Sequence, residues 1–165
     1  MYRIGEYRDC ETLNATLRAR IERLSQDEIV RRHHYLGGRY ENLYVAIDSI
    51  PEMRAILDMV MVQAADILNR SPKDLCLGWW FNIMRPGDIT YPHTHDDDDE
   101  LLSGVYYIDV PPQSGKLLLA SGAQRIEIEP QPGKFVFFAP DILHEVTCNE
   151  SGRPRISVGF NAGLA

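Results

Sequence analysis

Apolar residues in the first 77 positions recur every three or four residues, which is the spacing of an amphipathic helix. We predict one helix from Asp9, as its N-cap, to about His33, before a Leu-Gly-Gly segment at 36–38. His33 and His34 would then lie at the end of this helix, where the helix dipole favours positive charge. The apolar stripe behind this prediction is Leu13, Leu17, Ile21 and Leu24.

A second helix is predicted more clearly by the stretch that begins at Ser49. Ser49 is a suitable N-cap, Pro51 fits the first turn, and apolar residues then share one face as far as Leu68. The segment Asn-Arg-Ser-Pro at 69–72 would end this helix. The two helices together would make residues 1–77 a helical N-terminal part.

Beyond Leu77 the pattern changes to short runs of β-forming residues separated by Pro and Gly. Eight short strands preceded by two helices are typical of a double-stranded β-helix, the jelly roll that is also the cupin fold. We therefore predict a mainly β (α+β) fold, with residues 78–165 as the barrel core and both helices packed on one sheet. A plain β-sandwich is the alternative. The predicted strands span residues 79–85, 89–95, 103–110, 116–120, 125–129, 134–139, 142–147 and 155–161.

Size and charge narrow the functional classes. The chain has 165 residues, of which 44% are hydrophobic, so it fits a single domain, 1–165, with its own core. Its 17 basic and 24 acidic residues give a net charge of -7, which argues against nucleic acid or an anionic membrane as a partner. A small molecule or a peptide, in particular a cationic one, fits this charge better. The oligomeric state stays open.

The cysteines and the N-terminus bear on the cellular compartment. Cys10, Cys76 and Cys148 are too few and too far apart for a disulfide framework, so they favour a reducing compartment. The first residues are charged throughout and lack the apolar run of a signal peptide. No later run reaches the roughly 18 uninterrupted apolar residues of a membrane span. We therefore expect a cytoplasmic protein.

Two histidines separated by one residue, His93 and His95, fall at the end of a predicted strand. Side chains at positions i and i+2 of a strand point to the same face, so both imidazoles could bind one metal ion. A third histidine, His144, begins a later predicted strand. Neutral imidazole suits Fe, Zn, Cu and Ni, and a site with two or three protein ligands leaves positions for substrate.

The last predicted strand places Arg155 and Ser157 on one face. An inward arginine in an apolar barrel is costly unless it meets an anion, and its planar fork matches a carboxylate. Ser157 could donate to the same carboxylate, whereas a salt bridge to one of the 24 acids is the other interpretation. Asn82 is a polar break in an apolar strand; it could line the same cavity, and hydrogen bonding at a strand edge is the other interpretation.

Four segments, taken in order, resemble the 2-oxoglutarate- and Fe(II)-dependent oxygenases. They are RPGDITYPHTH (85–95), LLSGVYYIDVPPQSGKLLL (101–119), PGKFVFFAPDILHEVT (132–147) and RPRISVGFN (153–161). The resemblance is greatest to a group of small members with an H.H…SGVYY signature. Parts are also similar to aspartyl/asparaginyl β-hydroxylases and to prolyl hydroxylases. The match covers about residues 78–161.

This resemblance implies Fe(II) as the metal, 2-oxoglutarate as cosubstrate, and hydroxylation of an amino acid, peptide or other small molecule with release of succinate and CO2. By the same resemblance, His93 and His144 are iron ligands, and Arg155 with Ser157 holds the far carboxylate of 2-oxoglutarate.

Two further residues are assigned to the cosubstrate pocket. Asn82 is one of them. Strand alternation sends either Tyr106 or Tyr107 inward, and we assign Tyr106. Packing in the core is the other interpretation for this tyrosine.

The chain departs from the family at His95, because most members have an acid two residues after the first histidine. Three arrangements stay open: His95 is the third ligand, Asp97 or a neighbour supplies a carboxylate, or water fills the position. We favour His95, with Asp97 as the reserve. A shifted register that pairs His95 with Asp97 keeps the acid but displaces the Tyr-Pro-His match.

The same letters also fit the first metal motif of the cupins, in which His93, His95, Glu100 and a later histidine, here His144, all bind metal. Under this alternative the protein is an isomerase or a dioxygenase that does not use 2-oxoglutarate. A third hypothesis is a non-catalytic jelly roll that binds a sugar or a protein. The arginine and serine of the last strand favour the oxygenase.

Overall fold

The computed structural model describes residues 2–95, 99–122 and 124–165. The helices are α1 (Glu11–Ile21) and α2 (Met53–Leu68), with short 3-10 turns η1 (Gln26–Glu28), η2 (Ile47–Ser49) and η3 (Pro72–Asp74). The strands are β1 (Tyr2–Glu6), β2 (Ile29–Leu36), β3 (Arg39–Val45), β4 (Leu75–Met84), β5 (Thr90–His93), β6 (Glu100–Asp109), β7 (Leu117–Ser121), β8 (Gln124–Ile128), β9 (Lys134–Phe138), β10 (His144–Val146) and β11 (Arg155–Leu164).

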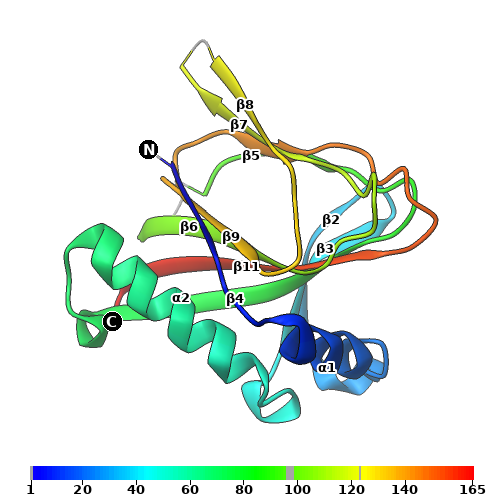
Figure 1. The fold of residues 1–165 in the computed structure, drawn as a ribbon, viewed down its shortest axis with the longest axis horizontal. Coiled ribbons are helices and arrows are strands. Elements are labelled where there is room, and N and C mark those ends of the chain that lie inside the picture. The colour runs from blue at the N-terminus through cyan, green and yellow to red at the C-terminus, as the bar shows by residue number, and fades with distance from the viewer. Residues whose placement is uncertain (1, 96–98, 123) are drawn as a thin grey trace.

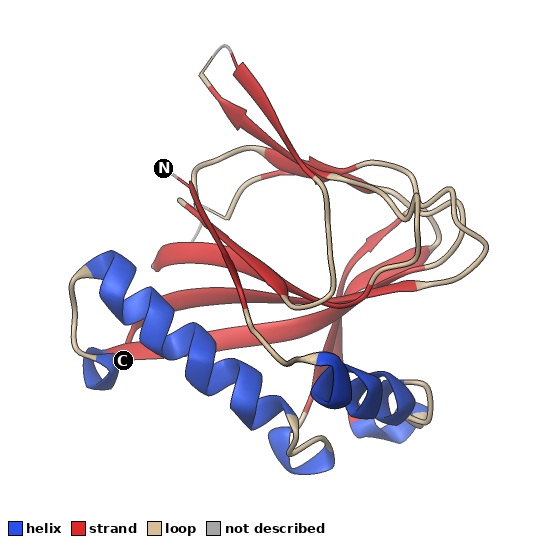
Figure 2. Cartoon of the chain, viewed as in Figure 1, coloured by secondary structure: helices blue, strands red, loops and turns tan. Residues whose placement is uncertain are grey.

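Two antiparallel sheets face each other, and α1 and α2 lie along the outer side of the larger one (Figure 1). The larger sheet has seven strands in the order β1-β9-β6-β11-β4-β3-β2, and the smaller has four in the order β5-β10-β7-β8. This is a double-stranded β-helix, so the predicted fold class is confirmed. The eight predicted strands correspond to β4 to β11, and Figure 2 shows how helices and strands separate into layers.

The first predicted helix is too long. Helix α1 ends at Ile21, and residues 29–45 form the hairpin β2–β3. Gly37 and Gly38 have φ of 58° and 82°, so they form the two-residue hairpin turn in which both positions need positive φ. The double glycine therefore ends a strand, not a helix, and His33 lies on β2. The N-terminal part is also not purely helical, because β1 pairs with β9 at the edge of the larger sheet.

The second predicted helix is confirmed as α2, which ends at Leu68 as expected. Asn69 follows it in the left-handed conformation, with φ 51° and ψ 51°, and its backbone N–H reaches the last carbonyls of the helix. The start differs from the prediction. Ser49 lies in the 3-10 turn η2, and the helix itself begins after Glu52.

Strand β11 contributes side chains to two buried regions, one between the larger sheet and the helices and one between the two sheets. Its residues Ile156, Val158 and Phe160 pack into the core between the larger sheet and the helices. The alternate residues Arg155 and Ser157 consequently face the space between the two sheets. The sheet is therefore buried on both faces, and the inner face carries the polar side chains.

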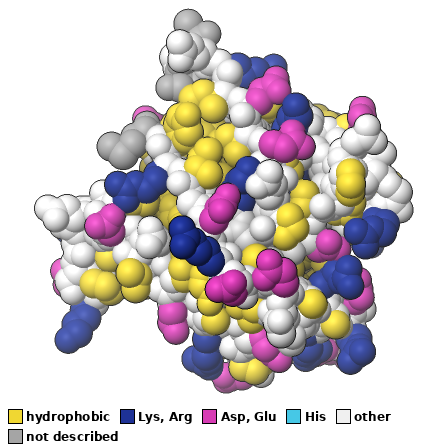
Figure 3. All heavy atoms as spheres, viewed as in Figure 1, with side chains coloured by type: hydrophobic (Ala, Val, Ile, Leu, Met, Phe, Trp, Pro, Cys, Tyr) yellow, Lys and Arg dark blue, Asp and Glu magenta, His cyan; other side chains and the backbone are white. Residues whose placement is uncertain are grey.

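Among the described residues on the face drawn in Figure 3, acidic and basic side chains are interspersed with apolar ones and do not gather by sign. Within the described part of the chain, no helix combines the length and the hydropathy that crossing a membrane requires.

Candidate active site

His93 and His144 face each other across a strand pair, because they are register partners in β5 and β10. Their ring centroids are 4.2 Å apart. The Nδ1 atom of His93 lies 2.8 Å from the carbonyl oxygen of Tyr91, and that of His144 lies 2.9 Å from the carbonyl oxygen of Ile142. A carbonyl oxygen can only accept, so each Nδ1 carries the proton and each Nε2 keeps its lone pair. Both rings thus have the tautomer and the fixed orientation of a metal ligand.

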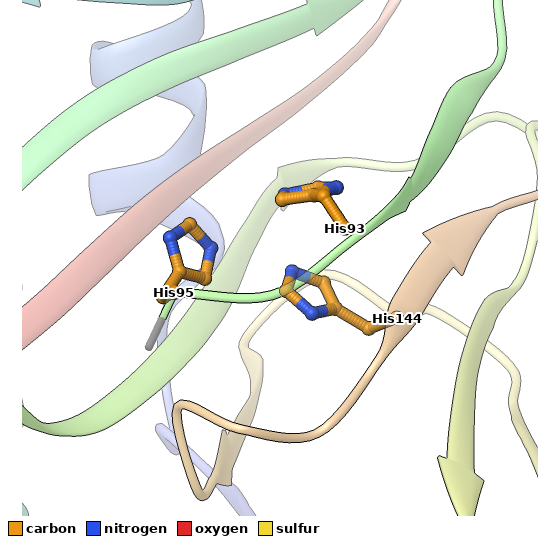
Figure 4. Close-up of side chains that lie close together, drawn as sticks. All are labelled: His93, His95 and His144. Atoms are coloured by element: carbon orange, nitrogen blue, oxygen red, sulfur yellow. The ribbon is translucent and has the colours of Figure 1, made fainter. Parts of the chain in front are cut away.

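His95 reaches the same space from just beyond the end of β5, which stops two residues short of the predicted strand end. Its backbone N–H donates to the carbonyl oxygen of Pro140 at 2.8 Å, which ties this segment to the approach to β10. The three imidazoles converge (Figure 4), and their potential ligand nitrogens all lie within 4.8 Å of one another. One metal ion therefore fits between His93, His95 and His144.

The electrostatics suit metal binding. Burial, together with the neighbouring His93, lowers the pKa of His95 to about 4 and that of His144 to about 3. Both rings are therefore neutral near pH 7 and present lone pairs without a competing proton. A donor set of three converging imidazoles suits Fe(II) as well as Zn(II).

Arg155 provides a buried positive charge in the same cavity. The residue is 2% exposed, and its Nη1 donates to the carbonyl oxygens of Ser114 at 3.4 Å and Gly115 at 3.1 Å. Its Nη2 has only the weakly accepting sulfur of Met84, and its Nε has no partner. Within residues 2–95, 99–122 and 124–165, no carboxylate forms an ion pair with Arg155. A buried guanidinium in this situation requires an anion.

Ser157, Asn82 and Tyr107 line the cavity together with Arg155. Ser157 and Asn82 therefore lie in the same cavity as the three histidines. The Oδ1 atom of Asn82 accepts a hydrogen bond from Nη1 of Arg39 at 3.2 Å, so its amide NH2 is the group left to face a ligand. The guanidinium carbon of Arg155 lies 5.7 Å from the ring centroid of Tyr107.

The assignment of Tyr106 is wrong. Its ring lies in the core between the larger sheet and the helices, and its hydroxyl donates to Oδ1 of Asn14 at 2.9 Å. Tyr107 is the inward residue, and burial raises its pKa to about 12, so its hydroxyl stays a neutral donor. Sequence pattern could not choose between the two, because both faces of β6 are buried and both carry apolar residues.

Of the two acids proposed as alternative ligands, the structure describes only Glu100. Asp97 lies outside the described residues. Glu100, at the start of β6, accepts a hydrogen bond from Nδ2 of Asn161 at 3.1 Å and does not belong to the cluster of potential ligands found within the described ranges. The four-ligand cupin set is therefore not assembled here.

The histidines and Arg155 line one cavity, whose volume of about 70 Å³ is several times the ~10–15 Å³ that one water molecule needs. Sequence reasoning missed the wall contributed by the hairpin β2–β3, which includes His34, Glu41 and Asn42. The signal that could have found this wall is the double glycine at 37–38, which marks a hairpin when strand-forming residues flank it.

Comparisons with known proteins bear on the fold. A comparison with protein-family models found no match, and neither did a comparison with curated protein sequences. Solved structures do match. A Pseudomonas putida prolyl-4-hydroxylase is 18% identical with a TM-score of 0.69, covering 99% of this chain and 88% of that chain.

Two further structures are similar over comparable lengths. The non-haem α-ketoglutarate-dependent carbocyclase SnoK from nogalamycin biosynthesis is 16% identical with a TM-score of 0.78, covering 98% of this chain and 79% of that chain. A Trichoplax adhaerens prolyl hydroxylase, solved with a peptide fragment of hypoxia-inducible factor, is 13% identical with a TM-score of 0.71, covering 98% and 83%. At these identities the likeness establishes the shared double-stranded β-helix.

Proposed function

We propose that the protein is a non-haem Fe(II)- and 2-oxoglutarate-dependent oxygenase, most simply a hydroxylase. The observation that carries the proposal is one cavity with two complementary features: three convergent imidazoles, and a buried arginine that has no carboxylate partner among the described residues. The first feature fits a divalent metal ion and the second fits a carboxylate. The similar folds described above include enzymes named for 2-oxoglutarate dependence, which supports the same reading.

In this proposal His93, His95 and His144 hold the iron. His95 takes the place of the usual carboxylate, since its ring already lies with the other two, and Asp97 is kept as the reserve ligand. With 2-oxoglutarate bound, iron supplies the oxidation of a substrate C–H bond to C–OH by O2, with release of succinate and CO2.

The protein's residues bind and orient in this scheme. Arg155 forms a charge-assisted pair with the far carboxylate of 2-oxoglutarate, and Ser157, Tyr107 and the Asn82 amide donate to it. The carbonyl oxygens of Tyr91 and Ile142 accept from the Nδ1–H groups of His93 and His144. These hydrogen bonds hold both rings in place and favour the tautomer in which Nε2 is free to bind metal. The apolar walls exclude water from the reacting groups.

The alternatives are weaker on specific observations. A cupin-type isomerase or dioxygenase needs Glu100 among the ligands, but Glu100 is bonded to Asn161 instead. A non-catalytic jelly roll that binds a sugar or protein would need neither three convergent imidazoles nor a buried arginine without a carboxylate partner among the described residues of the same cavity.

The substrate of the proposed reaction is an amino acid, a peptide or another small molecule, and we favour a cationic one because the chain carries a net charge of -7. We propose in addition that residues 1–165 act as a single domain, because β1, β2 and β3 belong to the same sheet as the barrel strands. The cysteine pattern favours a cytoplasmic location.

Succinate release tests the proposal. Purified protein is incubated aerobically with Fe(II), ascorbate and 2-oxoglutarate, with and without a panel of amino acids, peptides and amines. We expect slow succinate formation without added substrate, faster formation with a substrate, and a product mass increase of one oxygen. Iron-loaded protein that forms no succinate would contradict the proposal. The variant Glu100→Gln separates the oxygenase from the cupin alternative. The oxygenase proposal predicts that the variant still binds metal, whereas the cupin alternative predicts that it loses the metal.

A further inference from the structure

One wall of the cavity takes no part in holding the metal or the 2-oxoglutarate carboxylate. It comes from the hairpin β2–β3 and includes Glu41 and Asn42. These two residues are only 4% and 8% exposed, so their polar groups face the cavity and not bulk water. A carboxylate and an amide oxygen both accept hydrogen bonds, and the wall therefore offers acceptors to whatever occupies the cavity.

The charge on this wall is not balanced. Arg39 contacts Oε1 of Glu41 through Nη2 at 3.1 Å and Oδ2 of Asp88 through Nε at 3.3 Å. One guanidinium thus serves two carboxylates, and the group of three carries a net charge of -1 (one positive against two negative charges). Beyond Arg39, Arg155 is the buried cation of this cavity, and in the proposed function the far carboxylate of 2-oxoglutarate neutralises it. Arg85 is exposed, so solvent screens its charge. Of the two carboxylates, only Glu41 lines the cavity.

Two neighbours complete the wall. His34 lines the cavity although its φ of 52° is in the left-handed region, which non-glycine residues adopt at a cost. Trp80 presents an aromatic face, because β11 has a glycine beneath it: a Cβ atom on Gly159 would come within 2.5 Å of the indole. The face of an indole attracts cations and packs against apolar chains.

We propose that this wall binds a primary or secondary ammonium group of the substrate, with Glu41 as counter-ion, Asn42 as second acceptor and Trp80 as the aromatic surface. This inference rests on the proposed function in one respect: the bound ammonium compound is the substrate that the oxygenase oxidises. Anion and cation are then sorted to different walls of one cavity: 2-oxoglutarate to Arg155, and the amine to Glu41.

The test compares two probes of equal chain length, n-butylamine and 1-butanol, on protein loaded with Zn(II) and 2-oxoglutarate at pH 7. Zinc has no redox chemistry, so no turnover consumes the probe. Binding is followed by NMR through the indole N–H signals, of which the chain has only two, from its two tryptophans. We expect the dissociation constant of the amine to be about tenfold below that of the alcohol, and Glu41→Gln to bring this ratio to about one.

Glu28→Gln is the matched control, since Glu28 is also paired with an arginine, Arg20, but lies outside the cavity. It should keep the wild-type ratio. The proposal is overturned if the wild-type protein shows no preference for the amine, or if the preference survives in Glu41→Gln. Should that variant not fold, Asn42→Ala serves instead: a ratio lowered about threefold supports the proposal and an unchanged ratio overturns it.

The binding experiment and the succinate assay test different proposals. The binding experiment involves no turnover, so a protein that forms no succinate would contradict the proposed oxygenase activity without changing the measured preference for the amine. An absent preference with normal succinate formation contradicts only the amine site.

Discussion

The imidazoles and the guanidinium in this cavity respond differently to the same burial. Burial lowers the pKa of His95 and His144 far below neutral pH, so these rings lose their charge and become lone-pair donors. Burial also lowers the pKa of Arg155, but the ordinary pKa of a guanidinium is so high that the charge stays. One apolar environment thus produces a site for a cation next to a site for an anion.

Substitution of a proposed metal ligand should have the largest effect. His144→Ala removes a proposed ligand whose tautomer and orientation are fixed by the Ile142 carbonyl. We expect the affinity for Fe(II) or Zn(II) to fall by at least about 100-fold, beyond what loss of a supporting hydrogen bond costs. Calorimetric titration with Zn(II) measures it. His33→Ala, on β2, is the control and should bind metal normally; equal affinities in both variants would contradict the assignment.

Arg155→Met should separate binding from stability. We expect the dissociation constant for 2-oxoglutarate to rise about 10- to 100-fold, because a charge-assisted contact is lost, while Zn(II) affinity is kept. The ligand-free protein should be as stable as wild type or more stable, because a buried unpaired charge has been removed. Urea unfolding measures the free energy. A large loss of stability with unchanged 2-oxoglutarate affinity would mean that Arg155 is structural.

The stability of the metal-free protein should depend on pH in a defined direction. The folded pKa values of His95 and His144, about 4 and about 3, lie below the ordinary value of 6.5. The unfolded chain therefore binds more protons in this window, and stability that is full above pH 6.5 is lost as the pH falls towards 4 and 3. Melting temperatures from pH 7.5 to 4 should decline, less steeply in His144→Ala. A flat profile would show that the rings are not buried as neutral groups.

The two adjacent tyrosines give the smallest and most local contrast. Tyr106→Phe should cost about 1 kcal/mol of unfolding free energy, because its hydroxyl bonds Asn14, and should leave the KM for 2-oxoglutarate unchanged. Tyr107→Phe should raise that KM by a few-fold and change stability less, since Tyr107 lines the cavity and none of the hydrogen bonds found among the described residues involves its hydroxyl. If Tyr106→Phe raised the KM for 2-oxoglutarate and Tyr107→Phe did not, Tyr106 would be the tyrosine of the cosubstrate pocket.

The barrel was predictable from sequence because each of its strands is short and bounded by Pro or Gly, which fixes where the chain turns. His93 was proposed from its spacing to His95 on one predicted strand, and the resemblance to the oxygenases added the roles of His144 and Arg155. The hairpin β2–β3 was missed because the apolar spacing of α1 continues past the end of the helix to Leu24, which extends the apparent helix. Strand β2 is also mostly exposed, so its sequence lacks the apolar alternation of a half-buried strand. In sequence, Gly37 and Gly38 are equally compatible with the end of a helix and with a hairpin turn.

The other misses have the same kind of cause. The inward tyrosine could not be chosen because β6 is apolar on both faces. The wall of Glu41 and Asn42 depends on β3 pairing with β4, a contact between segments about 40 residues apart that no local pattern encodes. His95 was expected on a strand, but it lies beyond the end of β5 and is positioned by the Pro140 carbonyl.

The most direct test of the central claim is an anaerobic absorption titration of Fe(II)-loaded protein with 2-oxoglutarate. The account predicts a visible metal-to-ligand charge-transfer band that saturates at one equivalent of 2-oxoglutarate in wild-type protein. In Arg155→Met the band should need a much higher 2-oxoglutarate concentration, and in His144→Ala it should be absent. Iron-loaded wild-type protein that develops no band with saturating 2-oxoglutarate would contradict the claim that this cavity joins a metal to a carboxylate.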